Sequence, residues 1–244
     1  MIDLHAHVLP GVDDGARDLE EALAMLRLAQ EDGTTVLCAT PHAHGPTYAV
    51  DRAVAVAAHE RLATAARAAG LTIELRLAGE TWFRPDLARL AREGLLPTFA
   101  AGGHRYALVE FPPTHVPPEA AEVLFELRLE GVTPVIAHPE RNPSFWARPA
   151  DAVALRAQGA LLQVTAGSLT GLFRRESRDC AKALARAGAV DVLASDCHRS
   201  DRRPPGLSEA IAVLTKWIGR RATERATTDV PEALLAGRAA PEGA

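Results

Sequence analysis

The feature that most constrains the fold is the regular alternation of two kinds of segment along the chain of 244 residues. Short apolar runs rich in β-branched residues predict strands at 2–5, 34–40, 72–79, 105–110, 133–138, 161–165 and 190–195. Longer Ala/Leu/Arg segments of helical period predict helices near 18–32, 51–69, 84–93, 117–130, 149–158, 171–187 and 207–225. Because a helix follows each strand, parallel β/α units that close into a barrel are favoured. The near-continuous apolar character of most strands suits a parallel sheet covered on both faces.

The chain is expected to form a single domain over residues 1–236, since no Ser/Gly-rich linker divides it and no repeat recurs at a fixed period. The tail at 237–244 is expected to be disordered. Asp18 is the expected N-cap of the first helix, and Gly33 is its expected stop.

Charge and cysteine content exclude several classes of protein. The 27 Lys and Arg residues against 31 Asp and Glu residues give a net charge of −4, which leaves no electrostatic footprint for nucleic acid. No uninterrupted apolar stretch approaches the ~20 residues of a membrane span, and the N-terminus has no secretory signal. Cys38, Cys180 and Cys197 form no disulfide framework. We therefore expect a cytoplasmic protein that neither enters a membrane nor binds nucleic acid.

Imidazoles and carboxylates gather at the carboxyl ends of the predicted strands, the face on which β/α barrels build active sites. The set is His5, His7, His42, Glu80, Glu110, His138, Asp196 and His198. A single His at a strand end is usually an ordinary loop residue, but residues at equivalent ends of several strands converge in space. Glu80 and Glu110 each close an apolar run, where an unpaired carboxylate would be costly. The joint pattern predicts a metal site.

The donor types and their number indicate which metals fit. Mixed nitrogen and oxygen donors favour Mn²⁺, Fe or Zn²⁺ over Ca²⁺, which prefers oxygen ligands, and Mn²⁺ is the expected choice. Eight donors exceed the needs of one ion and predict two or three. Several ions in one site are typical of in-line phosphoryl chemistry.

Two loop arginines follow the proposed donors and are candidates for phosphate binding, because a guanidinium can hold phosphate oxygens with two parallel hydrogen bonds. Arg141 lies in His138-Pro-Glu-Arg-Asn142, and Arg203 follows the Asp196/His198 pair. Arg199 and Arg202 are alternatives to Arg203 that the sequence does not rank.

Two further loops have both an ordinary and a functional interpretation. The segment at 9–15 is either a plain turn or a rim loop in which Asp13 or Asp14 supports a ligand. The segment at 165–170 either supplies hydroxyls to the site or, as we expect, caps the next helix. His44 and His115 are candidates for the rim, and no general acid is assigned.

A thiol mechanism is an alternative, because Cys197 and Arg203 have the C-x5-R spacing of thiol-based tyrosine phosphatases. A phosphate-cradling loop needs Gly or small residues so that backbone N–H groups converge. This loop holds instead two other arginines, a histidine and Asp201, whose charge would repel phosphate. The second such spacing, Cys180 to Arg186, lies within a predicted helix, so the thiol mechanism is disfavoured.

Taken together, the motifs resemble the PHP (polymerase and histidinol phosphatase) superfamily. They are most similar to the bacterial metal-dependent protein-tyrosine phosphatases of capsule and exopolysaccharide loci. The matching stretches are His5-x-His7-x-Leu9-Pro-Gly-x-Asp-Asp-Gly15, Ala39-Thr-Pro-His42, Gly79-Glu80, Glu110-Phe111-Pro112, His138-Pro-Glu-Arg-Asn142, Thr165-Ala-Gly-Ser-Leu-Thr-Gly171 and Ser195-Asp196-Cys-His198.

The resemblance implies a distorted seven-stranded (β/α) barrel with a trinuclear metal centre. The family's ligands fall on the eight donors given above, and its two phosphate-site arginines fall on Arg141 and Arg203. The implied substrate is a phosphotyrosine protein, often an autophosphorylated kinase that controls polysaccharide polymerisation. His44 and the Trp82-Phe83 pair depart from the family pattern and bear on substrate specificity.

We therefore expect a metal-dependent enzyme that hydrolyses phosphomonoesters, with phosphotyrosine as the expected substrate. One alternative is a phosphatase for small molecules such as histidinol phosphate. The other is a non-catalytic module that keeps its metals for structure or binds phosphoproteins without turnover.

Overall fold

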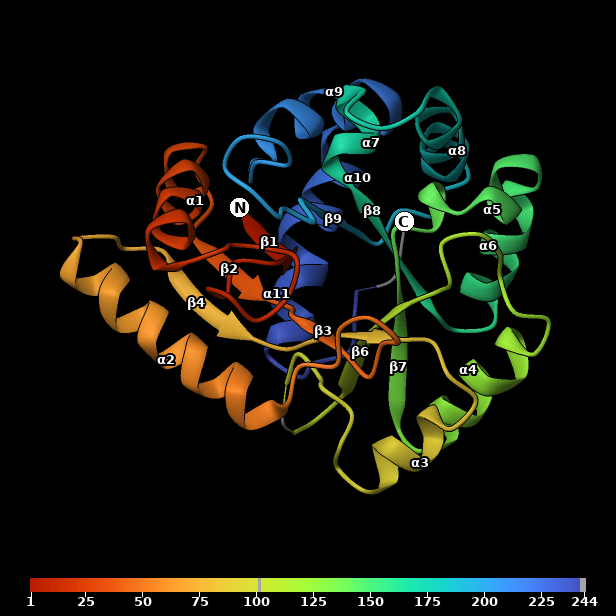
Figure 1. Cartoon of the computed structure of the whole chain (residues 1–244). Coiled ribbons are helices and arrows are strands. Elements are labelled where there is room, and N and C mark those ends of the chain that lie inside the picture. The colour runs from red at the N-terminus through yellow and green to blue at the C-terminus, as the bar shows by residue number, and fades with distance from the viewer. Residues whose placement is uncertain (101, 242–244) are drawn as a thin grey trace.

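The structure is a computed structural model that describes residues 1–100 and 102–241. Its strands are β1 (Ile2–Ala6), β2 (Val36–Ala39), β3 (His42–Ala43), β4 (Glu74–Leu77), β5 (Glu80–Trp82), β6 (Arg105–Glu110), β7 (Val132–Ala137), β8 (Leu161–Thr165) and β9 (Val192–Ala194). Its α-helices are α1 (Leu19–Glu31), α2 (Arg52–Ala68), α3 (Leu87–Arg92), α4 (Ala120–Leu129), α5 (Pro143–Ala147), α6 (Pro149–Ala157), α7 (Ala166–Thr170), α8 (Arg175–Arg186), α9 (Ser208–Ile218), α10 (Arg220–Glu224) and α11 (Val230–Leu235). A 3₁₀ turn covers Pro139–Arg141, and a π-helix covers Arg225–Asp229. Figure 1 shows the strands in the middle of the molecule, with α1 to α6 and α8 around them.

The strands form two parallel sheets, which confirms an α/β fold but not a closed seven-stranded barrel. One sheet has the order β1-β2-β4, and the other has the order β3-β5-β6-β7-β8-β9. The two sheets meet where β1 ends beside the segment after β9. There Ala6 forms an isolated parallel bridge with Cys197, and the backbone N–H of His7 donates to the carbonyl of Cys197 at 2.8 Å.

Two predicted strands are interrupted, and the interruptions create β3 and β5. The strand expected at 34–40 ends at Ala39, and Pro41, which has no N–H to donate, separates β2 from β3. The strand expected at 72–79 ends at Leu77, and Gly79 lies between β4 and β5. A Cβ at Gly79 would lie 2.9 Å from Pro97, so only glycine fits this close approach.

As a result, His42 begins β3 and Glu80 begins β5. The sequence had instead predicted that both residues lie at the carboxyl ends of longer strands. The two residues are register partners in the β3–β5 ladder. The interruption therefore moves both side chains from the first sheet to the second.

The predicted helices are present, with differences at their ends. Asp18 caps α1 as expected, its side chain accepting a hydrogen bond from the N–H of Glu21 at 2.9 Å. The helix predicted at 171–187 begins only at Arg175, because α7 precedes it and ends at Gly171, where φ is +92°. The helix predicted at 207–225 is divided into α9 and α10 at Gly219, where φ is +82°.

Alternate residues of the strands pack on opposite sides. One group of buried side chains from both sheets, with Leu4, Leu108 and Val135 among them, packs against Val230 and Leu234 of the chain's C-terminal part. A second group, which includes Val109 and Ile136, packs against the helices α3 to α9. Because both sheets contribute to the same inner core, they enclose it together, and the functional side chains project beyond its carboxyl-end edge.

The last described residues extend past the predicted domain end at 236. The phenolic oxygen of Tyr106 donates to the carbonyl of Arg238 at 3.0 Å and accepts from the N–H of Ala240 at 2.9 Å. Residues 242–244 of the predicted disordered tail lie outside the described residues. Among the residues that are described, no helix has the length and apolar character needed to cross a membrane.

Candidate metal centre

All eight predicted donors lie together at one end of the two sheets. The donors form four overlapping groups. Within each group, every side chain offers one donor atom, and these atoms lie within 4.8 Å of one another. The groups are His7, Asp14, His42 and His198; His5, Glu80 and His138; His5, His7 and Asp196; and His42, Glu80 and Glu110. The eight donors therefore converge in space, as their positions at the strand ends predicted.

His5 and His7 present their Nε2 atoms to each other at 3.2 Å, because alternate residues of β1 point to the same side. The opposite nitrogen of each ring is occupied. His5 Nδ1 lies 2.9 Å from Gln163 Oε1, and His7 Nδ1 lies 2.9 Å from Asp13 Oδ2. Since these oxygens accept, both rings donate from Nδ1 and direct Nε2 into the cluster, the usual arrangement of metal-binding histidines.

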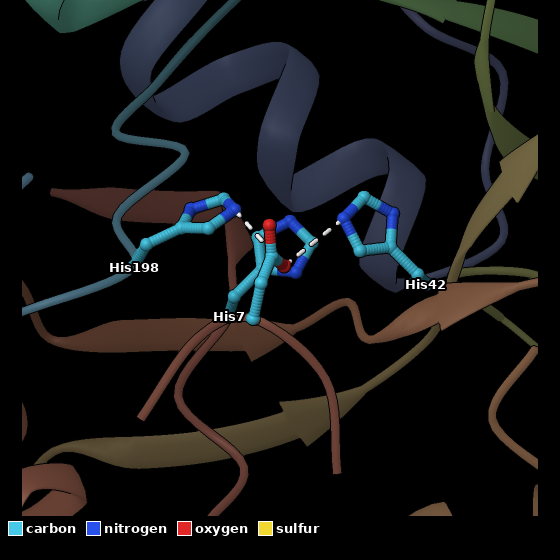
Figure 2. A group of neighbouring side chains, drawn as sticks. His7, His42 and His198 are labelled. Atoms are coloured by element: carbon cyan, nitrogen blue, oxygen red, sulfur yellow. Dashed lines mark ion pairs between the residues drawn. The ribbon is translucent and has the colours of Figure 1, made fainter. Parts of the chain in front are cut away.

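Asp14 joins the imidazoles of His42 and His198. Its Oδ1 lies 3.3 Å from His42 Nε2 and 3.4 Å from His198 Nε2. Figure 2 shows the His42 and His198 rings approaching from opposite sides, with His7 between them. The sequence offered Asp13 or Asp14 only as a ligand support, and the structure separates their roles: Asp13 holds His7, whereas Asp14 is itself among the converging donors.

The loop at 9–15 reaches this position through a close backbone contact. The N–H of Gly15 donates to Asp13 Oδ1 at 3.0 Å, and a Cβ at Gly15 would lie 2.0 Å from the carbonyl oxygen of His7. Only glycine can therefore fold the loop back onto β1. The plain-turn interpretation of this segment is insufficient, because the turn positions two carboxylates.

Glu80 is the central carboxylate of the cluster. Its Oε1 lies 3.1 Å from His138 Nε2 and 3.3 Å from His5 Nε2, and its Oε2 lies 3.1 Å from His42 Nδ1. Glu110 lies farther out, with Oε1 3.6 Å from His138 Nε2. Glu80 is only 1% exposed, so this charge is desolvated and depends on the groups around it.

Two of the donors have a left-handed backbone that non-glycine residues rarely adopt. The φ angle is +32° at His138 and +51° at Asp196. His138 turns the chain from β7 into the 3₁₀ turn, and the N–H of Asp196 donates to the carbonyl of His5 at 2.8 Å. Such conformations cost on the order of 1–3 kcal/mol each and concentrate at functional sites, where the surrounding structure imposes them.

The imidazoles compensate the carboxylates electrostatically. Burial opposes a charge on His7, but hydrogen bonds to Asp13 and Glu80 raise its pKa to about 10. Burial likewise opposes a charge on His42, but hydrogen bonds to Asp14 and Glu80 raise its pKa to about 11. His7 and His42 thus favour a bound proton that balances the neighbouring carboxylates, a role that bound cations would take over.

Glu110 and His138 differ from their neighbours in the direction of their pKa shifts. Burial, together with the negative charge of Glu80, raises the pKa of Glu110 to about 7. Burial, together with the charge of Arg141, lowers the pKa of His138 to about 4. The site therefore carries more acidic groups than its own imidazoles balance, and this donor chemistry fits several divalent cations.

Arg141 and Arg203 converge on the far oxygen of one donor. Arg141 donates to Asp196 Oδ2 from one terminal nitrogen, and Arg203 donates to the same oxygen. Arg203 reaches it because the chain folds back after His198, whose N–H donates to the carbonyl of Arg203 at 3.0 Å. The Nε of Arg203 is buried and has no hydrogen-bond partner among the described residues.

The structure also ranks the three alternative arginines. Arg199 donates from Nε to Glu21 on α1 at 2.9 Å and is directed away from the donors. Arg202 is exposed. Arg203 is therefore the one that lies at the cluster.

The thiol mechanism is not supported. Cys197 has no exposed surface, and burial raises the pKa of its thiol above the ordinary value. Burial also raises the pKa of Cys180 to about 12. Neither thiol is available as a thiolate nucleophile at neutral pH.

Two buried polar residues beside the cluster were not predicted from the sequence: Gln163, which supports two donors, and Glu140, which holds the start of α7. Gln163 Oε1 accepts from His5 Nδ1 and from the N–H of His138 at 3.3 Å, so the sixth predicted strand does contribute to the site. Glu140 Oε1 accepts from the N–H of Thr165 at 3.0 Å and from Ser168 Oγ at 2.7 Å. In the sequence, the signal for Gln163 was its place as a polar residue inside the apolar run at 161–165.

The rim candidates do not join the cluster. His44 Nε2 lies 3.2 Å from the carbonyl oxygen of Leu95, and His115 is exposed beside Thr114. The segment at 165–170, which was expected to cap the next helix, itself forms α7; Thr165 occupies the N-cap position of α7, but its side chain makes no cap hydrogen bond.

Known proteins share both the sequence and this architecture. The family described as capsular polysaccharide synthesis, CpsB/CapC, matches residues 1–236. The tyrosine-protein phosphatase YwqE of Bacillus subtilis is 35% identical over 90% of this chain and 85% of its own length. The putative tyrosine-protein phosphatase CapC of Staphylococcus aureus is 31% identical over 84% of this chain and 79% of its own.

A solved structure agrees with these relatives. It comes from work on YwqE from Bacillus subtilis and CpsB from Streptococcus pneumoniae, described as unique metal-dependent tyrosine phosphatases. Its TM-score is 0.91 at 32% identity, covering 100% of this chain and 97% of that chain.

Proposed function

The chain belongs to the CpsB/CapC family, and on that premise we propose that it is a metal-dependent phosphatase that hydrolyses phosphotyrosine in proteins. The family membership confirms the resemblance seen in the sequence. The observation that carries the proposal is a cluster of converging imidazoles and carboxylates in which one buried member, Asp196, also binds two arginines. Such a cluster provides both a site for cations and a site for the phosphate anion.

We assign the metal ions to nine side chains, eight predicted from the sequence and one added by the structure. They are His5, His7, Asp14, His42, Glu80, Glu110, His138, Asp196 and His198. The mixed donors suit two or three ions, and Mn²⁺ is the ion proposed, with Fe or Zn²⁺ as alternatives. When bound, the ions supply Lewis-acid activation of the phosphoryl group and of water.

The chain's own residues bind and orient the phosphate. Arg141 and Arg203 are both held on Asp196 Oδ2, which places their guanidinium groups side by side at the cluster. Guanidinium groups held before the reaction stabilise the charge that develops on the phosphoryl oxygens without further reorganisation. Gln163 and Asp13 keep the tautomers of His5 and His7 fixed during this step.

A pocket beside the donors favours an aryl phosphate over a polar small molecule. It has about 390 Å³ of free space, including solvent at its mouth. Phe111, Pro113, Ala137 and Pro139 provide its apolar lining, and Glu110, His138, Arg141 and Asn142 provide its polar lining. A phenolic ring would bury apolar surface there while its phosphate faces the arginine.

The test is metal removal and replacement. After treatment with a chelator, hydrolysis of an aryl phosphate should disappear, and Mn²⁺ should restore it. Turnover that persists without metal would contradict the proposal. A comparison of kcat/KM for a phosphotyrosine peptide and histidinol phosphate separates the protein phosphatase from the small-molecule alternative. A loaded protein without turnover on either substrate would point to a non-catalytic module.

Three finer predictions belong to this proposal. An autophosphorylated bacterial tyrosine kinase is the proposed partner, in line with the capsular family description. The cytoplasm is the proposed location, in keeping with the three free cysteines. We also infer that the two sheets correspond to an interrupted seven-stranded barrel, since β3 and β5 continue the course of β2 and β4.

A further inference from the structure

The segment that follows β8 has a role that neither helix capping nor metal binding explains. Its helix α7 is fixed at its start by the buried carboxylate of Glu140, which accepts from the N–H of Thr165 and from Ser168. Glu140 directly precedes Arg141 in the chain. The segment is therefore connected to the turn that carries one of the phosphate-site arginines.

The chain folds back on itself as soon as α7 ends. Gly171 has φ +92°, and the N–H of Leu172 then donates to the carbonyl of Gly167 at 2.9 Å. A Cβ at Gly167 would lie 2.9 Å from Phe173 Cε2 and 3.0 Å from Leu172 Cδ2, so both side chains pack directly against this glycine. Gly171 thus provides the turn, and Gly167 provides the surface against which the Phe173 ring packs.

The ring of Phe173 lies against the guanidinium groups of both arginines. The guanidinium carbon of Arg141 is 4.5 Å from the centre of the Phe173 ring, and that of Arg203 is 5.5 Å from it. Both distances are within the range of a cation–π interaction. The same guanidiniums donate to Asp196, so each arginine is held on one side by a carboxylate and on the other by the face of an aromatic ring.

We propose that Phe173 is a positioning residue, an aromatic platform that fixes Arg141 and Arg203 for the phosphate. The inference rests on the proposed function, because it takes these arginines as the phosphate site. An arginine side chain loses much rotamer freedom when it binds an anion, and stacking on a fixed ring removes that freedom beforehand. Phe173 is half-buried and does not donate to or accept from the substrate itself.

The test measures binding of inorganic phosphate to the Mn²⁺-loaded full-length protein by calorimetry, alongside the KM for an aryl phosphate. Phe173→Leu removes the π face while keeping apolar volume, and Phe173→Tyr keeps the face. Two cation–π contacts of ordinary strength predict that Phe173→Leu raises the Kd and the KM about five- to thirty-fold. Phe173→Tyr should stay within about twofold of the natural protein.

The neighbour Leu172 provides the matched control, because it packs on the same glycine and has no aromatic ring to offer the arginines. Leu172→Ala should leave both values within about twofold, which would separate the ring's effect from damage to the turn. If Phe173→Leu unfolds, Phe173→Met fills the space without a ring and decides in its place.

The outcomes distinguish this inference from the function on which it rests. Phosphate binding by Phe173→Leu that equals the natural protein, with hydrolysis intact in both, overturns the platform and leaves the phosphatase assignment standing. A natural protein that binds phosphate but hydrolyses no ester overturns the function, while the Leu and Tyr variants still decide the platform through their Kd values. Equal loss in Leu and Tyr variants indicates simple packing and also overturns the platform.

Discussion

Replacement of Gln163 by leucine should weaken metal binding without touching any proposed ligand. Gln163 is completely buried on β8, and its Oε1 accepts from His5 Nδ1 at 2.9 Å and from the backbone N–H of His138 at 3.3 Å. Leucine has a similar size but no acceptor. Both N–H groups would then be buried without a partner, and the ring of His5 would lose the bond that fixes its tautomer.

The size of the effect follows from these two contacts. A buried donor left without an acceptor costs about 1–3 kcal/mol, and two donors are affected, so the metal-free protein should lose about 2–6 kcal/mol of unfolding free energy. Loss of an outer partner of a metal-binding histidine typically lowers metal affinity about 10–100-fold. The affinity for Mn²⁺ should therefore fall by one to two orders of magnitude in Gln163→Leu.

Competition with a chelator of known affinity measures the Mn²⁺ binding, and urea unfolding of the metal-free protein measures the stability. Thr165→Val is the matched control, because the side-chain hydrogen bond of Thr165 within the described part of the chain is one that Oγ1 accepts from the amide nitrogen of Gln163 at a long 3.5 Å. This control should keep the Mn²⁺ affinity within about threefold. A Gln163→Leu protein that binds Mn²⁺ as tightly as the natural protein would refute the reasoning.

Three other predictions address the remaining assignments. Asp14→Asn should lower the metal content measured by elemental analysis, since Asp14 is one of four donors that meet there; unchanged content would make it an ordinary loop residue. Cys197→Ser should retain kcat/KM within about threefold, because the thiol is buried with a raised pKa, and a hundredfold loss would revive the thiol mechanism. Arg203→Ala should lower kcat about 10²–10³-fold, whereas Arg199→Ala, which removes only a contact to Glu21, should have little effect on kcat; the reverse order would overturn their assignment.

Regular segments of the fold were predictable because they depend on local pattern. The strands at 105–110 and 161–165 have the bounds that the apolar runs predicted. By contrast, β3 and β5 have two and three residues, which is too short for any periodicity to show. Their existence depends on the parallel pairing of His42 with Glu80, two residues that are distant in sequence. A pairing of that kind is decided only when the sheets assemble.

The sequence by itself determined which donor types gather and at which end of the strands, because carboxyl ends of parallel strands share one edge. It did not determine which side chains complete and support the cluster. Gln163 reaches His5 across 158 positions of the chain, and Arg199 reaches Glu21 across 178. Such contacts have no local signature, since they depend on how helices and loops pack after the strands have formed. Only the tertiary structure therefore separated Asp14 from Asp13, selected Arg203 over Arg199 and placed Phe173 under both phosphate-site arginines.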